Sequence, residues 1–105
     1  MTILESKISN QIRAEISKRG GYSIKLHSSG FQGAGEPDVI ACIKGQLIAI
    51  ETKRPGEHLK PIQTHRLNQW LRAGAITIVA TSREDFKKQY EEKTWAPGPR
   101  KHKWS

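Results

Sequence analysis

The apolar residues at the start of the chain recur with the period of a helix. One of them stands at every fourth position over residues 4–16, which places them on a single helical face. Thr2 and Glu5 have capping-box spacing, and this accounts for Glu5 as a capping residue. Gly20-Gly21 supplies a common helix stop. We therefore predict a helix over residues 2–19.

The period then shortens to that of a strand. Apolar residues alternate with polar ones at Tyr22, Ile24 and Leu26. We expect a half-buried first strand in which these three residues form the buried face. Two apolar runs follow, over residues 38–43 and 46–53. The Lys44-Gly45 turn between them predicts an antiparallel hairpin.

A helical period returns after the hairpin. Pro61 fits the first position of a helix, and Gly74 fits its end. An apolar fourth strand is expected over residues 75–81, and a last helix over residues 83–93. The helix between the third and fourth strands is a crossover connection, so those two strands are predicted to pair in parallel.

These elements predict an α/β fold with a central mixed sheet of about four strands flanked by helices. Their order is helix, three strands, helix, strand and a short C-terminal helix. A chain of 105 residues has room for one domain, which we expect to span residues 1–105. The prolines and the glycine within residues 94–105 predict a flexible basic tail.

Composition narrows the class of partner. The chain has 18 Lys and Arg against 10 Asp and Glu, a formal net charge of +8, which favours a polyanion such as nucleic acid. No basic helix with a wide apolar face stands out, so a membrane partner is not expected. Residues 1–7 lack the basic segment and long apolar core expected of a signal peptide, and the one cysteine, Cys42, lies in an apolar run. These features predict a cytoplasmic location, for which a bacterial or phage-infected cell is one setting.

Charged side chains interrupt the apolar pattern at two neighbouring strand ends. Glu51 and Lys53 are two residues apart, so they point the same way where the third strand ends. The hairpin reversal brings Asp38 opposite Glu51 or close to it. Two carboxylates and the backbone carbonyl of Thr52 are the oxygen ligands that Mg²⁺ prefers. Lys53 can polarise a water or neutralise a phosphate. Each residue alone fits a turn cap or a surface pair, but together they favour a metal-dependent phosphodiesterase site.

An ordered set of motifs contains these residues. Gly35-Glu36-Pro37-Asp38 enters the second strand, Glu51-Thr52-Lys53 leaves the third, and Leu59-Lys60-Pro61-Ile62-Gln63 opens the next helix. The set resembles the signature of PD-(D/E)xK nucleases and, more closely, that of their VRR-NUC branch. The resemblance covers roughly residues 7–81. It implies a restriction-endonuclease-like core and a divalent-metal-dependent nuclease that uses Mg²⁺ or Mn²⁺.

The resemblance also implies roles for individual residues. Asp38 and Glu51 would be metal ligands, Lys53 the catalytic lysine, and Gln63 a further active-site residue. The alternative role of Gln63 is a hydrogen bond at the start of its helix.

Members of the superfamily often carry an acid on the first helix that reaches the metal. Glu15 borders the apolar stripe and is the candidate for this catalytic and metal-binding role. Its alternative is a surface ion pair with Lys18 or Arg19. Glu5 is the competing acid, but the capping box already explains it.

DNA contacts are expected from polar and basic residues near this site. They are Lys25, Ser29, Gln32, Arg54, Lys60 and Arg66. The glycine-rich loop over residues 28–36 lacks the lysine and hydroxyl residue of a phosphate-binding loop, so we expect it to form a lip over the metal site. Aromatic and basic residues of the tail could stack on unpaired bases. A solvated tail without contacts is the alternative.

The leading hypothesis is a metal-dependent DNA endonuclease acting on branched or four-way junction DNA. A homodimer is expected because the resemblance extends to junction resolvases. One alternative is a less selective nicking or end-processing nuclease, and another is a noncatalytic nucleic-acid-binding module. Clustered carboxylates repel phosphate unless a cation lies between them, which favours an enzyme over a binding module.

Overall fold

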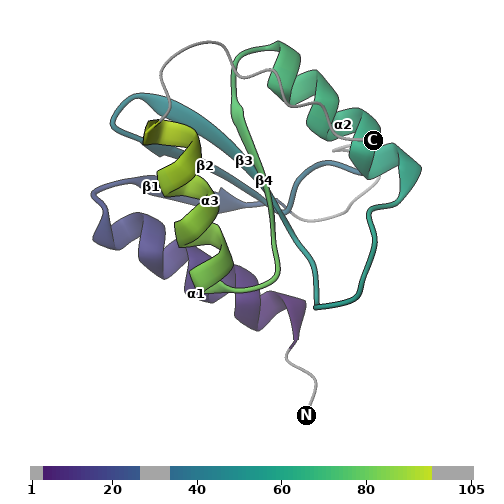
Figure 1. Ribbon diagram of the computed structural model, residues 1–105, viewed down its shortest axis with the longest axis horizontal. Helices are drawn as coiled ribbons and strands as arrows, with labels where there is room; N and C mark the ends of the chain where they lie inside the picture. The colour runs from purple at the N-terminus through teal and green to yellow at the C-terminus, as the bar shows by residue number, and fades with distance from the viewer. Residues whose placement is uncertain (1–3, 27–33, 96–105) are drawn as a thin grey trace.

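The computed structural model describes residues 4–26 and 34–95. Its elements are α1 (Glu5–Lys18), β1 (Tyr22–Lys25), β2 (Val39–Ile43), β3 (Gln46–Thr52), α2 (Pro61–Arg72), β4 (Ile76–Ala80) and α3 (Arg83–Trp95). This is the predicted α/β order (Figure 1). The last helix extends two residues beyond the predicted end at Lys93, and the rest of the predicted tail, residues 96–105, lies outside the described residues.

The four strands form one mixed sheet in the order β1-β2-β3-β4. β1 and β3 both pair antiparallel with β2, and β3 pairs parallel with β4, as the crossover through α2 predicts. Lys44 and Gly45 both have positive φ, at 50° and 79°. Such a turn matches the twist of the strands on either side of it. The predicted hairpin and its turn are therefore confirmed.

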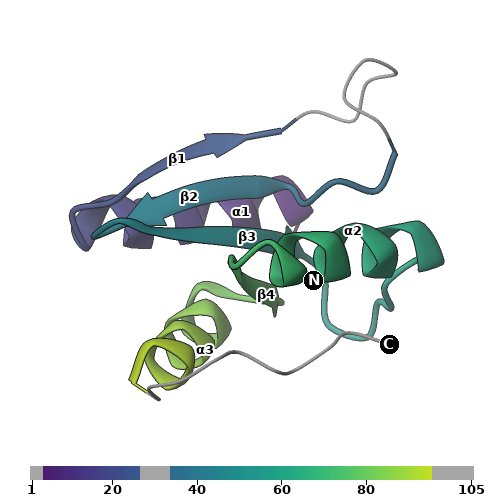
Figure 2. The ribbon, with the colours of Figure 1, turned by 90° about the horizontal axis from the view of Figure 1, so that it is seen from above.

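The helices lie on both faces of the sheet. α1 and α3 pack together on one face, while α2 lies on the other face beside β4 (Figure 1 and Figure 2). Ile8, Ile12 and Ile16 of α1 are fully buried against the sheet, together with Phe86 of α3. The apolar residues that recur every four positions in α1 are therefore the ones that pack into this core. No helix in the described ranges is long and apolar enough to cross a membrane.

The start of α1 differs from the prediction. The helix begins at Glu5, after Leu4, and no side chain caps it; Thr2 lies outside the described residues. Leu4 is 66% exposed instead of joining the core. The capping explanation for Glu5 is therefore wrong, which leaves its carboxylate available for another role.

The face of β1 was also predicted wrongly. Tyr22 is 76% exposed and Ile24 is 45% exposed, whereas Ser23 between them is buried. Ser23 pairs with the buried Ala41 on the face that α1 covers. β1 is an edge strand, and the helix on the other face, α2, packs at the opposite edge of the sheet (Figure 2). The alternation of apolar and polar residues correctly predicted a strand. It does not indicate which face of that strand a helix will cover.

Candidate active site

Two acids stand at adjacent strand ends. Val39 pairs with Ile50 in the β2–β3 ladder, so Asp38 and Glu51, one residue further on each strand, continue the same register. The sequence predicted this juxtaposition from the hairpin. Glu51 is almost completely buried at 2% exposure, and Asp38 is half-buried.

Thr52 holds the side chain of Asp38. Its backbone N–H donates to Asp38 Oδ2 at 2.9 Å, and its hydroxyl donates to the same oxygen at 2.5 Å. These bonds fix the carboxylate at the end of the sheet through Oδ2 and leave Oδ1 without a hydrogen bond from the described residues. The sequence pointed to the carbonyl of Thr52 as a ligand, but its amide and hydroxyl are the groups that position the acid.

The carboxylate of Glu51 is held on one side only. Its Oε2 accepts a hydrogen bond from Gln63 Nε2 at 2.9 Å and lies 3.5 Å from Lys53 Nζ. Its Oε1 is buried and has no hydrogen-bond partner among the described residues. Burial, and next the charge of Asp38, raise the pKa of Glu51 to about 8, against the opposing effect of Lys53. A buried carboxylate oxygen without a hydrogen-bond partner destabilises the fold unless a ligand binds to it.

Gln63 connects the start of α2 with the acids. Its Oε1 accepts from the backbone N–H of Lys60 at 2.9 Å while its Nε2 donates to Glu51. The helix-start role and the active-site role were alternatives from the sequence, and the structure supports both contacts at once. Pro61 begins the helix one residue after Lys60, which sets Gln63 within reach of the strand end.

Glu15 does not join this cluster. Its Oε2 accepts from Arg19 at 2.7 Å and its Oε1 from Arg83 at 3.0 Å, which ties α1 to the first turn of α3. Burial alone would raise the pKa of Glu15, but the hydrogen bonds from the two guanidinium groups lower it below its ordinary value. The expectation that Glu15 reaches the metal ligands is therefore corrected. Its alternative, an ion pair with Arg19, is the contact observed.

Glu5 is the acid of α1 that lies near the site. Burial, followed by a hydrogen bond with the Glu57 carboxyl, raises its pKa, and the charges of Lys53 and Asp38 also act on it. Ten residues separate Glu5 from Glu15, about 15 Å along a helix, so only the N-terminal end of α1 reaches the strand ends. The position of Glu5 in the first turn of α1 could have indicated this, because an acid at the start of a helix can face a site that lies past the end of the helix.

The donor set can be tested against the needs of a divalent cation. The described residues contain no group of three or more His, Cys, Asp and Glu side chains placed to hold a metal ion. Mg²⁺ commonly takes only one or two carboxylates and completes its shell with waters and substrate phosphate. Asp38 and Glu51, with the unpartnered Glu51 Oε1, fit that requirement.

Helix α2 also clamps the segment that leads into Asp38. Trp70 donates to the carboxylate of Glu36 at 3.1 Å, and Arg66 donates to the carbonyl of Ala34 at 3.2 Å. Gly35 has a φ of 82°, and a Cβ there would lie 2.9 Å from the carbonyl of Ile62. Only glycine fits this approach without displacing backbone. The Glu36–Trp70 contact carried no signal in the sequence.

The predicted DNA-contact residues fall into three groups. Arg54 is paired with Glu57, and Arg66 is bonded within the fold. Lys25 is half-buried at the end of β1, and Lys60 is exposed at the start of α2. Ser29 and Gln32, with most of the predicted loop lip, lie outside the described residues.

Comparison with known proteins supports one class. No protein-family model matches the chain. A curated relative, "Putative nuclease p44" of Acyrthosiphon pisum secondary endosymbiont phage 1, is 32% identical over 83 residues, which is 78% of this chain and 87% of the relative.

Solved structures show the same fold. One titled "VRR_NUC domain" has a TM-score of 0.71 at 22% identity, over 83% of this chain and 94% of its own. The Archaeoglobus fulgidus Hjc structure, described as a Holliday junction resolvase, has a TM-score of 0.58 at 25% identity, over 71% of this chain and 65% of its own. Fold and relatives together define a nuclease domain with a restriction-endonuclease-like core. The chain belongs to the same family as the phage relative "Putative nuclease p44", and its fold is that of VRR-NUC domains.

Proposed function

We propose that this protein is a Mg²⁺- or Mn²⁺-dependent DNA endonuclease, with its phosphodiesterase site where β2 begins and β3 ends. One observation carries the proposal: Asp38 and Glu51 meet in register, and Glu51 keeps a buried oxygen without a partner beside Lys53. Structural carboxylates in a binding module would gain nothing from this arrangement, because they repel the phosphates that the +8 chain attracts.

The side chains around the acids have distinct roles in this proposal. A divalent cation bound by Asp38, Glu51 and the Thr52 carbonyl would neutralise phosphate charge and lower the pKa of a bound water. Thr52 orients Asp38, and Gln63 orients Glu51 through Oε2 so that Oε1 stays available. The Lys53 ammonium can hold the attacking water or a phosphate oxygen, because it lies beside Glu51 and not in open solvent.

We further propose branched DNA, the four-way junction above all, as the substrate, and a homodimer as the working form. Support comes from the likeness to the Hjc structure, whose title names a Holliday junction resolvase. Symmetric cleavage of a junction needs two active sites related by a two-fold axis, which a homodimer supplies. A less selective nicking or end-processing nuclease is the alternative within the same chemistry.

A cleavage panel tests the chemistry and the substrate together. A four-way junction, a flap and a linear duplex are incubated with the protein and with Mg²⁺, Mn²⁺ or a chelator. We expect metal-dependent cleavage that is fastest on the junction. Equal rates on all three substrates would favour the less selective nuclease, and absence of cleavage with every metal would contradict the proposal.

Two substitutions test the residues. Asp38→Asn keeps an acceptor for Thr52, and Lys53→Met keeps the shape of the side chain without its charge. Each is expected to lower the cleavage rate by at least about a hundredfold, with DNA binding retained. Lys88→Met, at an exposed position of α3, is the control and should cleave like the unmodified protein. Full cleavage by Asp38→Asn or Lys53→Met would remove that residue from the site.

A further inference from the structure

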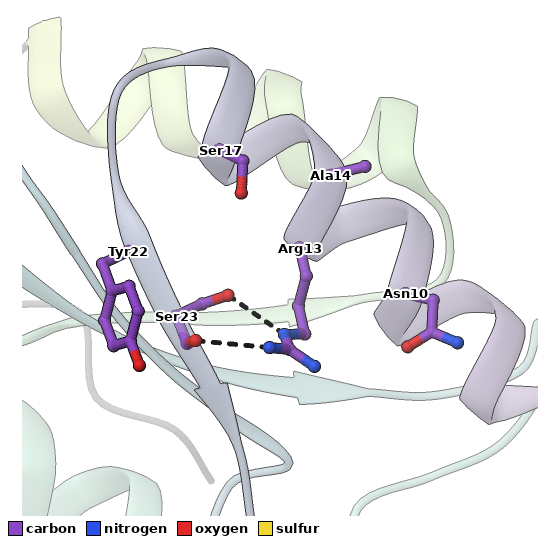
Figure 3. A pocket seen from close by; sticks show the side chains of 6 residues that line it. All are labelled: Asn10, Arg13, Ala14, Ser17, Tyr22 and Ser23. Atoms are coloured by element: carbon purple, nitrogen blue, oxygen red, sulfur yellow. Dashed lines mark hydrogen bonds between the residues drawn. The ribbon is translucent and has the colours of Figure 1, made fainter.

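A groove lies between α1 and β1, apart from the acids. It has a volume of about 370 Å³ and is lined by Asn10, Arg13, Ala14, Ser17, Tyr22 and Ser23 (Figure 3). This volume falls in the range of about 300–1,000 Å³ that is common for ligand sites. Asn10, Arg13 and Ser17 come from one face of α1, because their spacing is three and four residues.

Arg13 is held across the groove in a fixed orientation. Its Nε donates to the Ser23 hydroxyl at 3.1 Å, and its Nη2 donates to the Ser23 carbonyl at 3.3 Å (Figure 3). A guanidinium has five N–H donors, so these two bonds leave most of them for a ligand. Ser23 is buried, which makes it a firm support.

Arg13 has no acidic partner among the described residues, whereas three other arginines do. Arg19 and Arg83 are both paired with Glu15, and Arg54 is paired with Glu57. The two bonds of Arg13 go to neutral oxygens of Ser23, so its charge is not neutralised. A positioned guanidinium with an unneutralised charge in an open groove fits a phosphate group.

Strand β1 connects the groove with the level of the acidic strand ends. Lys25 shares a strand face with Ser23, two residues away, and pairs with Val39, the neighbour of Asp38. The next residue, Leu26, donates its N–H to the carbonyl of Asp38 at 2.8 Å. Ser23 is therefore about 10 Å along the strand from the level of Asp38. That is about three nucleotide steps of B-DNA.

We propose that the Arg13 groove binds a backbone phosphate of the DNA strand, about three nucleotides from the bond that is cut, with Lys25 as a second contact on the same face of β1. The inference rests on the proposed function for its ligand. It assigns the groove a positioning role, since Arg13 is too far along β1 to touch the reacting phosphate.

Binding in a chelator tests the groove without any cleavage. The affinity for a fluorescent four-way junction is measured over a range of salt concentrations for the unmodified protein, Arg13→Gln, Arg13→Lys and Arg72→Gln. Arg72 is the matched control, an exposed arginine at the end of α2. We expect Arg13→Gln to weaken binding about tenfold and to reduce the slope of log affinity against log salt by about 1. Arg13→Lys should keep the slope, and Arg72→Gln should keep both values.

An unchanged slope in folded Arg13→Gln would overturn the inference. The NMR signal of Arg13 Nε in the unmodified protein gives a second readout that does not depend on a variant that folds. It should shift on adding DNA and stay in place with inorganic phosphate at the same phosphate concentration. An equal shift with inorganic phosphate would mean a free-anion pocket and would overturn the DNA assignment. If Arg13→Gln weakens DNA binding but the unmodified protein cleaves no substrate with any metal, the Arg13 groove would stand as a DNA-binding site and the nuclease proposal would be rejected.

Discussion

The surroundings of Glu51 disfavour the charged form of its carboxylate. The side chain is almost completely buried, it faces Asp38, and only one of its oxygens is bonded to Gln63 and near Lys53. Burial of an acceptor without a partner costs about 1–3 kcal/mol. The fold tolerates this cost at the strand end where the proposed cation would bind, which is the pattern expected of a residue retained for function.

Glu51→Gln is therefore expected to stabilise the protein in a chelator. The folded-state pKa of Glu51, about 8, lies above its ordinary value of 4.5. Its stabilising contribution is thus fully present below pH 4.5 and is lost as the pH rises towards 8. The variant lacks this loss, so its advantage in melting temperature should grow over that interval. Glu84→Gln, on the exposed side of α3, is the control and should show no such growth.

Added Mg²⁺ or Mn²⁺ should reverse the order. Binding to the folded state alone raises the melting temperature of the unmodified protein, and Glu51→Gln should gain less because a ligand charge is missing. A stability profile of Glu51→Gln parallel to that of the unmodified protein at every pH would contradict the assigned environment of Glu51.

At the scale of elements, α1 presents two acids to two different neighbours. Glu5 in its first turn is near Lys53, while Glu15 joins Arg83 of α3. The apolar period predicted the helix and the buried Ile8, Ile12 and Ile16. It could not decide between the acids, because the choice depends on where the sheet ends along the helix. The same limit applies to β1, where the alternation was found but α1 covers Ser23 and not Ile24.

Matched substitutions of the two acids separate function from stability. Glu5→Gln should lower the cleavage rate and leave the melting temperature nearly unchanged, since Glu5 is near the site and makes no ion pair within the described residues. Glu15→Gln should cleave normally but lose about 1–3 kcal/mol of stability at neutral pH, because it breaks charged hydrogen bonds to Arg19 and Arg83.

The pH dependence gives this pair a second check. The lowered pKa of Glu15 means that its contribution is present above its ordinary pKa and is lost as the pH falls through the folded-state value. The stability difference between Glu15→Gln and the unmodified protein should therefore shrink in acid. The reverse result, in which Glu15→Gln abolishes cleavage while Glu5→Gln does not, would restore the original expectation for Glu15.

At the scale of the whole molecule, the site draws on three separate parts of the chain. Asp38 and Glu51 come from the hairpin, Gln63 from α2, and Glu5 from α1. The hairpin pair was predictable because a tight turn fixes its own register. Contacts such as Glu36 with Trp70 join segments far apart in sequence, and no local period encodes them. The order of elements could thus be predicted from the sequence. The long-range hydrogen bonds that hold the segments of the site together could not.

The proposed two-fold assembly makes a distinct prediction for mixed protein. A cruciform-containing plasmid is treated with unmodified protein, with Asp38→Asn, or with the two after they have been unfolded and refolded together. If each copy cuts one strand of the junction, the unmodified dimer should linearise the plasmid through paired cuts. The mixed dimer should instead leave nicked circles, because only one of its sites works. Asp38→Asn alone should leave the plasmid supercoiled. Linear product from the mixed sample in proportion to the active protein, without extra nicked circles, would show that the copies act independently.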